Sequence, residues 1–359
     1  MSNGFGRTTL AILIVLLVAI AGQPYIERYL YATTAPRPVA PRGDLAEWEK
    51  STIAVFDHVA PSVVQVISQR GANAVGEVGV ATGTGFIWDP AGHIVTNNHV
   101  VEGATRVAVR MASGEPIQAE VVGRAPTYDL AVLRISTVGL PPPITVGTSS
   151  DLKVGQAAYA IGNPFGLDQS LSTGVVSALK RRLPTSGGRE IADVIQTDAV
   201  INPGNSGGPL LDSAARLIGV TSAIYSPSGA YAGIGFAIPV DIVNRVAPQL
   251  IRDGRVPIAG IGILAADESQ TAQLGVTGVM VAQTVDGLPA ERAGIRGVDR
   301  RTGTVGDVIT EANGKRVRHL ADLADQLEAV GIGKSVKLTV RRANRDVSVD
   351  VPVVDVGQS

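Results

Sequence analysis

DAVINPGNSGGPL, residues 198–210, surrounds a single serine, Ser206, with residues that have little or no side chain. Glycine and asparagine precede the serine, and Gly207 and Gly208 follow it. Glycine costs backbone entropy on folding and contributes nothing to packing, so such a run needs a reason. One reason is an ordinary surface turn. The other is a nucleophile that needs open space above it and bare backbone N–H groups beside it.

The composition narrows both the fold and the function. The chain has 359 residues, of which 45% are apolar but only 4% aromatic, and its net charge is −1. The length predicts two or three domains with aliphatic cores. The balanced charge and the few aromatic residues argue against a nucleic-acid partner. With no cysteine, four histidines and no H-E-x-x-H motif, the sequence predicts no disulfide, no metal site and no cofactor.

Short runs rich in Val and Ile recur between turn residues from about residue 51 to residue 239. This texture is typical of β-strands. Residues 83–101 predict a strand, a turn and a second strand, and regular spacing of further runs predicts antiparallel sandwiches or barrels. The length favours two packed barrels. The other predicted strands are PSVVQVIS (61–68), RVAVRM (106–111), DLAVLRI (129–135), AAYAIG (157–162), LSTGVVSAL (171–179), RLIGVTSAI (216–224) and GIGFAIP (233–239).

The N-terminal segment is predicted to meet a membrane. Residues 8–26 contain no charged residue, and this uncharged run is long enough to span a bilayer. The Ala-Ile-Ala sequence at 19–21 also has the small-x-small form of a cleavage site, so the segment is either a retained signal anchor, which we favour, or a removed signal peptide. One arginine in residues 1–7 favours a cytoplasmic location for this end. The Pro-rich residues 27–47 predict an extended linker.

The rest of the chain is predicted to form two domains. Residues 48–253 hold the strands and end in an amphipathic helix over residues 240–254, which its internal proline should kink or shorten. Residues 254–356 make the second domain, with short strands, a helix over residues 319–330 and a closing pair of strands.

A serine nucleophile needs a base, and the base needs an acid that orients it. Of the four histidines, His99 is distinctive because it follows a strand inside the β domain, and Asp129 lies in the same domain just before an apolar strand. The order His99, Asp129, Ser206 is one of the known chain orders for this triad. Asp198 is the nearest acid to the serine, and we assign it a structural role. The other histidines fall in predicted helices or in a turn: His58, His93 and His319.

Alone, a histidine or an aspartate at such a position is more often a packing or turn residue. Four motifs in order, however, resemble the HtrA (Deg) family of exported serine proteases: TGTGFIWDPAGHIVTNNHVV (82–101), YDLAVLRI (128–135), AIGNPFGLDQSLSTGVVSAL (160–179) and VIQTDAVINPGNSGGPLLD (194–212). The resemblance implies a mostly β fold, a chymotrypsin-like double β-barrel followed by a PDZ domain, with an N-terminal transmembrane or signal helix. It implies His99 as general base, Asp129 as its orienting acid and Ser206 as nucleophile.

The same resemblance assigns the surroundings of the nucleophile. Gly204, Asn205 and Ser206 are expected to form the oxyanion hole, with the N–H groups of Gly204 and Ser206 turned toward one point. No acidic residue is placed in the expected pocket, so we expect cleavage after small aliphatic residues such as Val, Ala, Ile or Leu. The residues expected to line this first substrate pocket are Val200, Ile201, Thr221, Ser222, Ala223 and Ile224.

The C-terminal domain resembles a PDZ domain of this family. A loop there is expected to bind the C-terminal carboxylate of a peptide, which adds as a strand to an exposed sheet edge. An ordinary glycine-containing strand is the alternative. The presence of one such domain implies the membrane-tethered, single-PDZ type. The expected loop residues are Gly260, Ile261, Gly262 and Ile263.

In this family the PDZ domain controls whether the oxyanion loop is ordered. A basic loop with Arg181, Arg182 and Arg189 is expected to relay PDZ occupancy to Gly204, although a merely solvated loop would carry the same charges. Family members are usually trimers, so the resemblance implies a homotrimer.

Two functions remain open on the sequence. One is a regulated, ATP-independent serine endopeptidase of the cell envelope that acts on misfolded or signalling proteins. The other is an envelope chaperone or adaptor that binds unfolded chains or C-termini, with catalysis secondary. The intact triad favours the endopeptidase. The expected location is the bacterial inner membrane, single-pass, with both domains in the periplasm, and the alternative is a soluble periplasmic enzyme after signal cleavage.

Overall fold

The computed structural model describes residues 3–30, 37–72, 78–112, 114–163, 169–185, 190–202, 204–224, 233–268, 271, 277–299, 301, 304–343 and 345–357. The chain divides into two compact units, residues 1–47 and residues 48–359.

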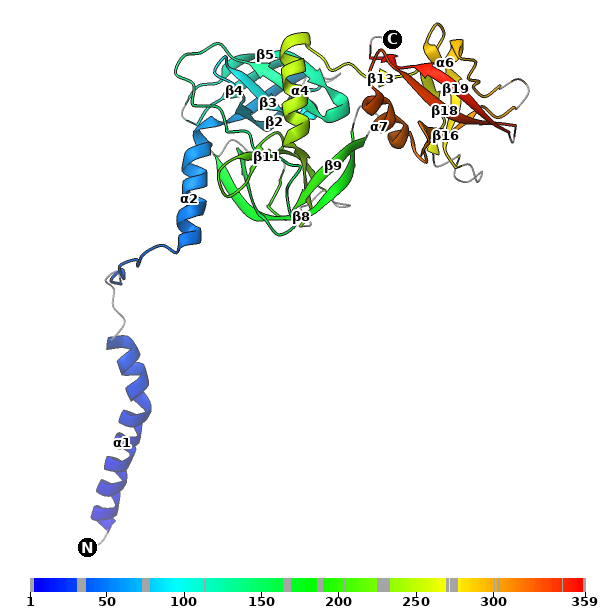
Figure 1. Cartoon of the computed structure of the whole chain (residues 1–359). Coiled ribbons are helices and arrows are strands. Elements are labelled where there is room, and N and C mark those ends of the chain that lie inside the picture. Colours follow the sequence, from blue (N-terminus) through cyan, green and yellow to red (C-terminus); the bar gives the residue numbers. More distant parts are fainter. Residues whose placement is uncertain are drawn as a thin grey trace. The chain divides into compact units, whose positions relative to one another are not determined.

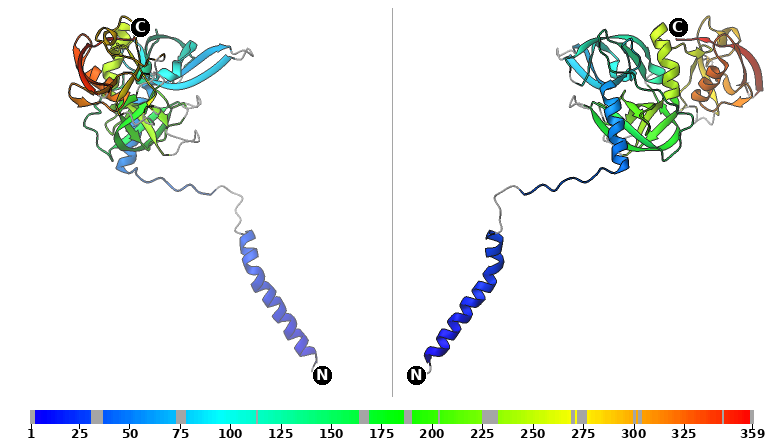
Figure 2. Two further views of the ribbon diagram at one scale, coloured as in Figure 1. Left: turned by 90° about the vertical axis from the view of Figure 1, so that its right-hand side faces the viewer. Right: turned by 60° about the vertical axis from the view of Figure 1, so that its left-hand side comes forward.

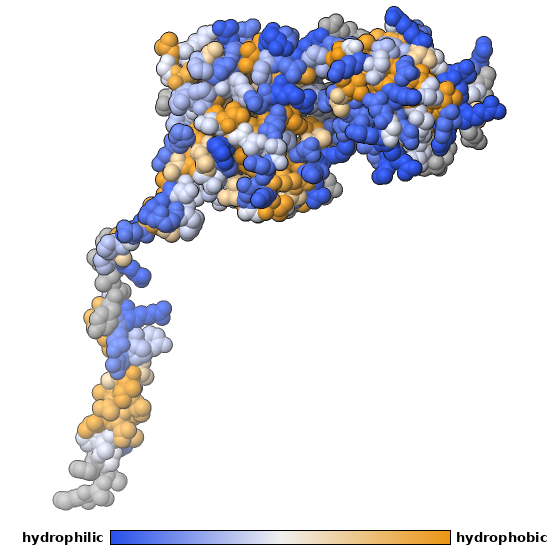
Figure 3. Space-filling model, in the orientation of Figure 1, coloured by the Kyte–Doolittle hydropathy of each residue, from blue (hydrophilic) through white to orange (hydrophobic). Residues whose placement is uncertain are grey.

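The first unit is dominated by one helix, α1 (Asn3–Leu30). Its residues 6–30 are long and apolar enough to cross a membrane, a test that an N-terminal signal sequence would also pass. Figure 3 shows apolar side chains around the middle of this helix. Such a surface favours hydrocarbon over water, which agrees with the predicted membrane or signal segment.

The second unit begins with α2 (Glu47–Val59) and the short helix η1 (Ala60–Ser62), and continues into a closed antiparallel barrel. Two further short helices, α3 (Asn98–Val101) and η2 (Pro126–Tyr128), lie in connections of this barrel. Its strands, in spatial order, are β1 (Val63–Ala72), β2 (Val78–Ile87), β3 (His93–Thr96), β6 (Leu130–Arg134), β5 (Ile117–Ala125) and β4 (Ala104–Arg110).

A second closed barrel follows, so the predicted double barrel is confirmed (Figure 1). It is again antiparallel throughout. Its strands, in spatial order, are β10 (Pro209–Leu211), β11 (Leu217–Ile224), β12 (Gly235–Pro239), β9 (Glu190–Thr197), β8 (Ser170–Pro184) and β7 (Ala157–Gly162).

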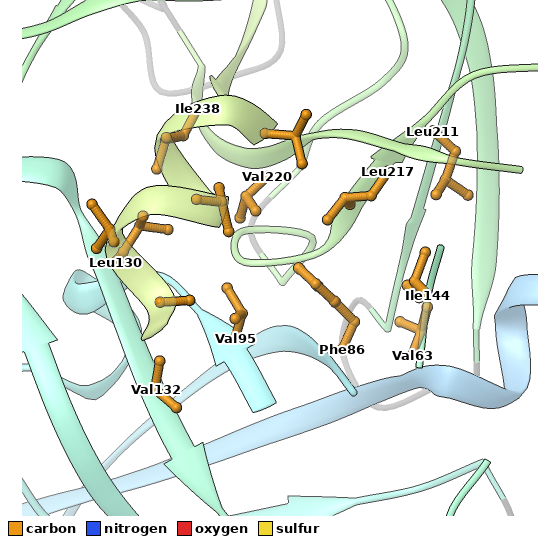
Figure 4. Close-up of a cluster of buried hydrophobic side chains, with 14 of the residues drawn as sticks. Val63, Phe86, Val95, Leu130, Val132, Ile144, Leu211, Leu217, Val220 and Ile238 are labelled. Atoms are coloured by element: carbon orange, nitrogen blue, oxygen red, sulfur yellow. The ribbon is translucent and has the colours of Figure 1, made fainter. Parts of the chain in front are cut away.

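The apolar run of β6 shows how the barrels are held together. Ala131 and Leu133 belong to the interior cluster of the first barrel, whereas Leu130 and Val132 belong to a larger cluster shared with the second barrel. Alternate strand residues point to opposite faces, so a strand buried on both faces reads as a continuous apolar run. Figure 4 shows the shared cluster, with Val132 and Leu217 contributed by opposite barrels.

The helix α4 (Val240–Asp253) lies beside both barrels and contacts β5, β6, β11 and β12 (Figures 1 and 2). Its buried face joins the shared cluster through residues such as Val243 and Leu250. The predicted stop at Gly254 is confirmed, because this residue has φ of 71° and caps the helix through the Leu250 carbonyl. The predicted shortening at Pro248 is wrong: the helix continues to Asp253 with Pro248 exposed, so packing of the buried face outweighs the lost hydrogen bond.

The C-terminal domain has its own aliphatic core. Its main sheet has the order β14 (Ile263–Ala265), β15 (Val279–Thr284), β16 (Val308–Ala312), β18 (Ser335–Arg342) and β19 (Arg345–Pro352), with β17 (Lys315–Arg316) paired to β16. A separate pair joins β13 (Ala259–Gly260) to β20 (Val354–Asp355), and two helices complete the domain, α6 (Pro289–Arg292) and α7 (Leu320–Val330). The predicted helix near residues 319–330 is confirmed, with His319 as its N-cap.

Candidate active site

Asp129 sits immediately after η2 with φ of 50°, a left-handed conformation that is uncommon outside glycine. Two bonds hold it there: its carbonyl oxygen accepts the N–H of Asn98 at 3.1 Å and the side-chain amide of Asn97 at 2.9 Å. Non-glycine residues in this region cost free energy and persist where the surroundings fix them. The surroundings therefore aim the Asp129 carboxylate.

His99 belongs to the one-turn helix α3 that follows β3, where the sequence predicted only a strand end. Its backbone N–H donates to Oδ1 of Asp129 at 3.0 Å, and its Nδ1 lies 2.9 and 2.8 Å from the two carboxylate oxygens. Asp129 thus holds both the backbone and the ring of His99. A histidine bonded through Nδ1 keeps Nε2 free to accept a proton, which is the orientation that a general base requires.

Ser222, on β11, adds a contact that sequence reasoning missed. Its hydroxyl donates to Oδ2 of Asp129 at 2.6 Å, and its side chain is 4% exposed. We expected Ser222 only in the wall of the substrate pocket. The sequence predicted that Ser222 lies on a strand that lines the substrate pocket. No pattern in that strand indicates a contact with an aspartate from the other barrel.

Ser206 lies in the connection between β9 and β10, and its hydroxyl donates to the carbonyl oxygen of Ser222 at 3.0 Å. Ser206 and His99 line the same open cavity of about 360 Å³. The cavity is also lined by Arg70, Ala81, Thr82, Val100, Ile201, Asn202, Gly204 and Ser222. The fold therefore brings all three predicted triad residues to one site, with His99 and Asp129 from the first barrel and Ser206 from the second.

The loop before Ser206 contains the backbone N–H groups that were predicted to bind an oxyanion. Gly204 has φ of 104°, a conformation open to glycine. The N–H of Asn205 donates to the carbonyl of Asn202 at 2.9 Å, so this predicted oxyanion residue uses its amide within the turn. Within the described part of the chain, the N–H groups of Gly204 and Ser206 have no hydrogen-bond partner. These two amides are the candidates for an oxyanion hole.

The predicted pocket residues fall into distinct places. Ile201 is buried and lines the cavity, and Val200 is 38% exposed. The Thr221 hydroxyl shares its one hydrogen between the carbonyls of Asn205 at 2.6 Å and Gly208 at 3.1 Å. It therefore lies against residues 204–208, which we call the nucleophile loop. Ala223 and Ile224 continue β11, with side chains outside the described residues.

The remaining acids and histidines are engaged elsewhere. The Asp198 carboxylate accepts the N–H of Val175 at 2.7 Å, which agrees with its predicted structural role. His93 begins β3, where a turn was predicted, and its ring contacts Asp89 at 2.7 Å. His58 is exposed on α2. Among the described residues, no group of three histidine, aspartate or glutamate side chains is placed to hold a metal ion.

In the C-terminal domain, the predicted carboxylate loop lies between β13 and β14. Ile261 is buried, and Gly262 has φ of 82°, where an added Cβ would meet the side chain of Leu288 at 2.3 Å. Among the described strands, β14 pairs only with β15, so its other edge has no strand partner there. A cavity of about 670 Å³ includes Ala265 of β14, residues of α7 and two residues of the second barrel. It is lined by Arg182, Glu190, Ala265, Ala266, Glu268, His319, Leu320, Ala321 and Ala324.

The predicted regulatory arginines differ in their contacts. Arg182, at the end of β8, contacts Asp325 at 2.9 Å and Asp322 at 3.6 Å, both on α7, and Glu190 at 3.7 Å. Partial burial alone would lower the pKa of Arg182, but the hydrogen bond and charge of Asp325, with the other two carboxylates, raise it. Arg181 instead donates to Gln196 on β9. The predicted Arg189 lies outside the described residues.

A second contact with α7 involves the residue next to Asp129. Tyr128, the last residue of η2, donates its hydroxyl hydrogen to Glu328 on α7. Burial, followed by the contact with the Glu328 carboxylate, raises the pKa of Tyr128 to about 12. The Arg245 guanidinium of α4 lies over the Tyr128 ring, 5.3 Å from its centroid.

Comparisons with known proteins agree with this geometry. Residues 83–220 match the trypsin-like peptidase domain, and residues 259–353 match the PDZ domain. The chain is 45% identical over 314 residues to Protease Do-like 1, a chloroplastic protein of Arabidopsis thaliana, covering 84% of this chain and 71% of the relative. It is 37% identical over 361 residues to a probable periplasmic serine endoprotease, DegP-like, of Chlamydia trachomatis, covering 99% of this chain and 69% of the relative.

Solved structures give the same result. The HtrA-type protease AlgW with a decapeptide superposes with a TM-score of 0.68 at 31% identity, covering 84% of this chain and 98% of that one. The serine endoprotease from Yersinia pestis gives a TM-score of 0.65 at 30% identity, covering 89% and 100%. Since similarity in sequence and fold extends through both domains, this chain belongs to the HtrA (Deg) family of serine endoproteases.

Proposed function

We propose that this protein is a regulated endopeptidase of the bacterial cell envelope, which cuts misfolded or signalling proteins without ATP. The observation that carries the proposal is the double contact of His99 Nδ1 with the Asp129 carboxylate, beside a cavity that also exposes Ser206. The open cavity suits an extended polypeptide better than a small molecule, because it has no enclosing lid among its lining residues.

The geometry supports acyl transfer through the nucleophile. Ser206 Oγ leaves the Ser222 carbonyl and turns toward Nε2 of His99, which takes its proton as Oγ attacks the peptide carbonyl. Asp129 stabilises the imidazolium that forms. The carbonyl oxygen becomes an oxyanion, for which the N–H groups of Gly204 and Ser206 are the donors. Nε2–H then protonates the leaving amine, and water releases the acyl group by the reverse sequence.

Cleavage after small aliphatic residues is the proposed specificity. None of the described residues lining the cavity is acidic, and Ile201 contributes an apolar wall. A Lys or Arg side chain would lose hydration there without gaining a carboxylate partner. A profile of the cut sites in denatured casein, read by mass spectrometry, tests this, and frequent cuts after Lys or Arg would contradict it.

Control by a peptide at the PDZ domain is supported by the unpaired edge of β14. A C-terminal peptide can add to this edge as a further strand, and the cavity beside it is bordered by α7 residues such as Leu320 and Ala324. We propose that occupancy of this groove alters the contacts of Arg182 with α7, and through them the oxyanion loop at Gly204.

The proposed location is the periplasm, with α1 retained as a single-pass anchor in the inner membrane and the protein assembled as a homotrimer. The apolar α1 and the DegP-like relatives named as periplasmic support this. Intact mass of the protein extracted from membranes distinguishes a retained α1 from a cleaved one. Light scattering of the detergent-solubilised protein measures the number of copies, and a monomer mass would refute the trimer.

Casein degradation by the full chain is the test of the enzyme function. The wild type is expected to degrade casein, and Ser206→Ala is expected to lose this activity while it keeps the same thermal unfolding temperature. Labelling by a serine-directed fluorophosphonate is the second readout: the wild type should react and Ser206→Ala should not. Two results together would make the protein a chaperone and not a protease. The wild type would have to degrade no casein, and the wild type and Ser206→Ala would have to prevent aggregation of unfolded casein equally well.

A further inference from the structure

Thr84, in the middle of β2, uses every polar atom it has. Its N–H donates to the carbonyl of Ser206 at 2.8 Å, and its own carbonyl accepts the Thr96 hydroxyl at 2.7 Å. Its hydroxyl donates to the carbonyl of Gly204 at 2.6 Å and accepts the N–H of Asn163 at 3.0 Å. The side chain is fully buried. One residue of the first barrel thus binds two carbonyls of the nucleophile loop in the second.

The nucleophile loop packs tightly against Thr84. A Cβ added at Gly207 would lie 2.2 Å from the Thr84 carbonyl oxygen, and one added at Gly208 would lie 3.1 Å from its Cγ2. Asn163, which donates to the Thr84 hydroxyl, directly follows β7. The hydroxyl therefore lies at a junction of three segments that come from both barrels.

Gly204 needs an outside restraint. Its φ of 104° is available to glycine, but glycine populates negative φ about as readily, so the residue itself does not select this conformation. The Thr84 hydroxyl holds the Gly204 carbonyl, while the Thr84 N–H holds the Ser206 carbonyl at the other end of the loop. Both amides proposed as oxyanion donors are close to these two held carbonyls. The Ser206 N–H lies between them along the backbone, and the Gly204 N–H lies just before the first.

We propose that the Thr84 hydroxyl is a positioning group that sets the oxyanion hole from the opposite barrel. It acts through Gly204 and does not touch the substrate. This inference rests on the serine-protease mechanism proposed above, and it adds a residue on which transition-state binding depends. A group that orients oxyanion donors affects the transition state more than the bound substrate, so its loss should lower kcat and leave KM nearly unchanged.

The test compares Thr84→Val, which keeps the shape and removes the hydroxyl, with Thr84→Ser, which keeps the hydroxyl. Removal of a whole oxyanion donor costs about 100- to 1,000-fold in kcat. Thr84→Val misplaces the oxyanion donors but does not remove them, so we expect a smaller loss. On a peptide excised from casein, kcat should fall about 10- to 100-fold, with KM within about twofold of wild type. Thr84→Ser should stay within about threefold of wild type. A peptide boronate, which mimics the tetrahedral state, should lose affinity for Thr84→Val by a similar factor.

Ser62→Ala is the control, because Ser62 is also buried and its hydroxyl bonds the Pro142 carbonyl at 2.6 Å and not the nucleophile loop. It should lose thermal stability in the same way as Thr84→Val but keep most of kcat. The proposal is overturned if Ser62→Ala loses as much kcat as Thr84→Val, if Thr84→Ser is as inactive as Thr84→Val, or if KM rises with kcat unchanged. Failure of the wild type itself to cut casein would instead refute the proposed function.

Discussion

The Ser222 hydroxyl donates a 2.6 Å hydrogen bond to Oδ2 of Asp129, across the boundary between the two barrels. The same residue accepts the hydroxyl of Ser206 at its carbonyl, 3.0 Å away. Ser222 lies where the pairing of β11 with β12 shifts register, between Thr221 and Ala223. Such a bulge re-aims a side chain. Ser222 therefore contacts both Asp129 and Ser206, the proposed acid and nucleophile.

Ser222→Ala should lower kcat about 10- to 100-fold, because a hydrogen bond to a charged group contributes about 1.5–3 kcal/mol. The variant keeps the backbone carbonyl, so its effect isolates the bond to Asp129. Steady-state kinetics on a casein-derived peptide measure it, with the boronate affinity as a second readout. An unchanged kcat would show that the two bonds from His99 hold the carboxylate without help.

Arg182→Ala should reduce activation by C-terminal peptides, because Arg182 contacts Asp325 and Asp322 on α7. Asp325→Asn should give a smaller reduction, because it leaves the contacts of Arg182 with Asp322 and Glu190 in place. Adding Asp325→Asn to Arg182→Ala should change nothing further, because the partner of Asp325 is already gone. Arg181→Ala is the matched control, because Arg181 bonds Gln196 within the second barrel. Fully additive effects of Arg182→Ala and Asp325→Asn would show that the pair does not act as one unit.

Tyr128 should remain protonated in alkaline solution, because burial and the Glu328 carboxylate raise its pKa to about 12. The unfolded chain ionises this phenol near pH 10. The stability that the neutral phenol contributes is therefore complete below about pH 10 and is lost as the pH rises from there toward 12. Tyrosinate absorbance of the folded wild type minus that of Tyr128→Phe measures the titration. Glu328→Gln should move it only part of the way back, since burial is the larger cause.

Gly207→Ala should abolish most activity and destabilise the fold. Gly207 has φ of 87°, and the added methyl would lie 2.2 Å from the Thr84 carbonyl and 2.4 Å from the Thr96 hydroxyl. The left-handed conformation alone costs an alanine about 1–2 kcal/mol. Thermal unfolding and casein degradation measure both losses. Gly114→Ala is the control, because its Cβ would meet nothing within 4 Å, and it should leave stability within about 0.5 kcal/mol.

The sequence was sufficient for the architecture and the family. Short runs rich in Val and Ile predicted the strands, and the residues around His99, Asp129 and Ser206 carried the resemblance that the comparisons confirm. These features depend on local pattern. The turn around Ser206 was likewise predictable as a loop with bare amides, because only glycine tolerates the φ of 104° at position 204 without strain.

The supporting contacts could not be predicted, because they join residues far apart in the chain. The helix α3 has four residues and is too short to show a helical period, so His99 was assigned to a strand end. Thr84 lies 120 residues from Gly204, and nothing in the residues around Thr84 names its partner. The contact of Ser222 with Asp129 depends on a register shift between β11 and β12, which has no signature in either strand.

The proposed triad is divided between the two barrels, so neither barrel contains it alone. His99 and Asp129 fold with the N-terminal barrel, whereas Ser206 arrives on a later stretch of polypeptide. If the proposed roles hold, a chain that has folded only its first barrel has a base without a nucleophile. Proteolytic activity would then arise only once the second barrel has packed against the first, which couples the activity to completed folding.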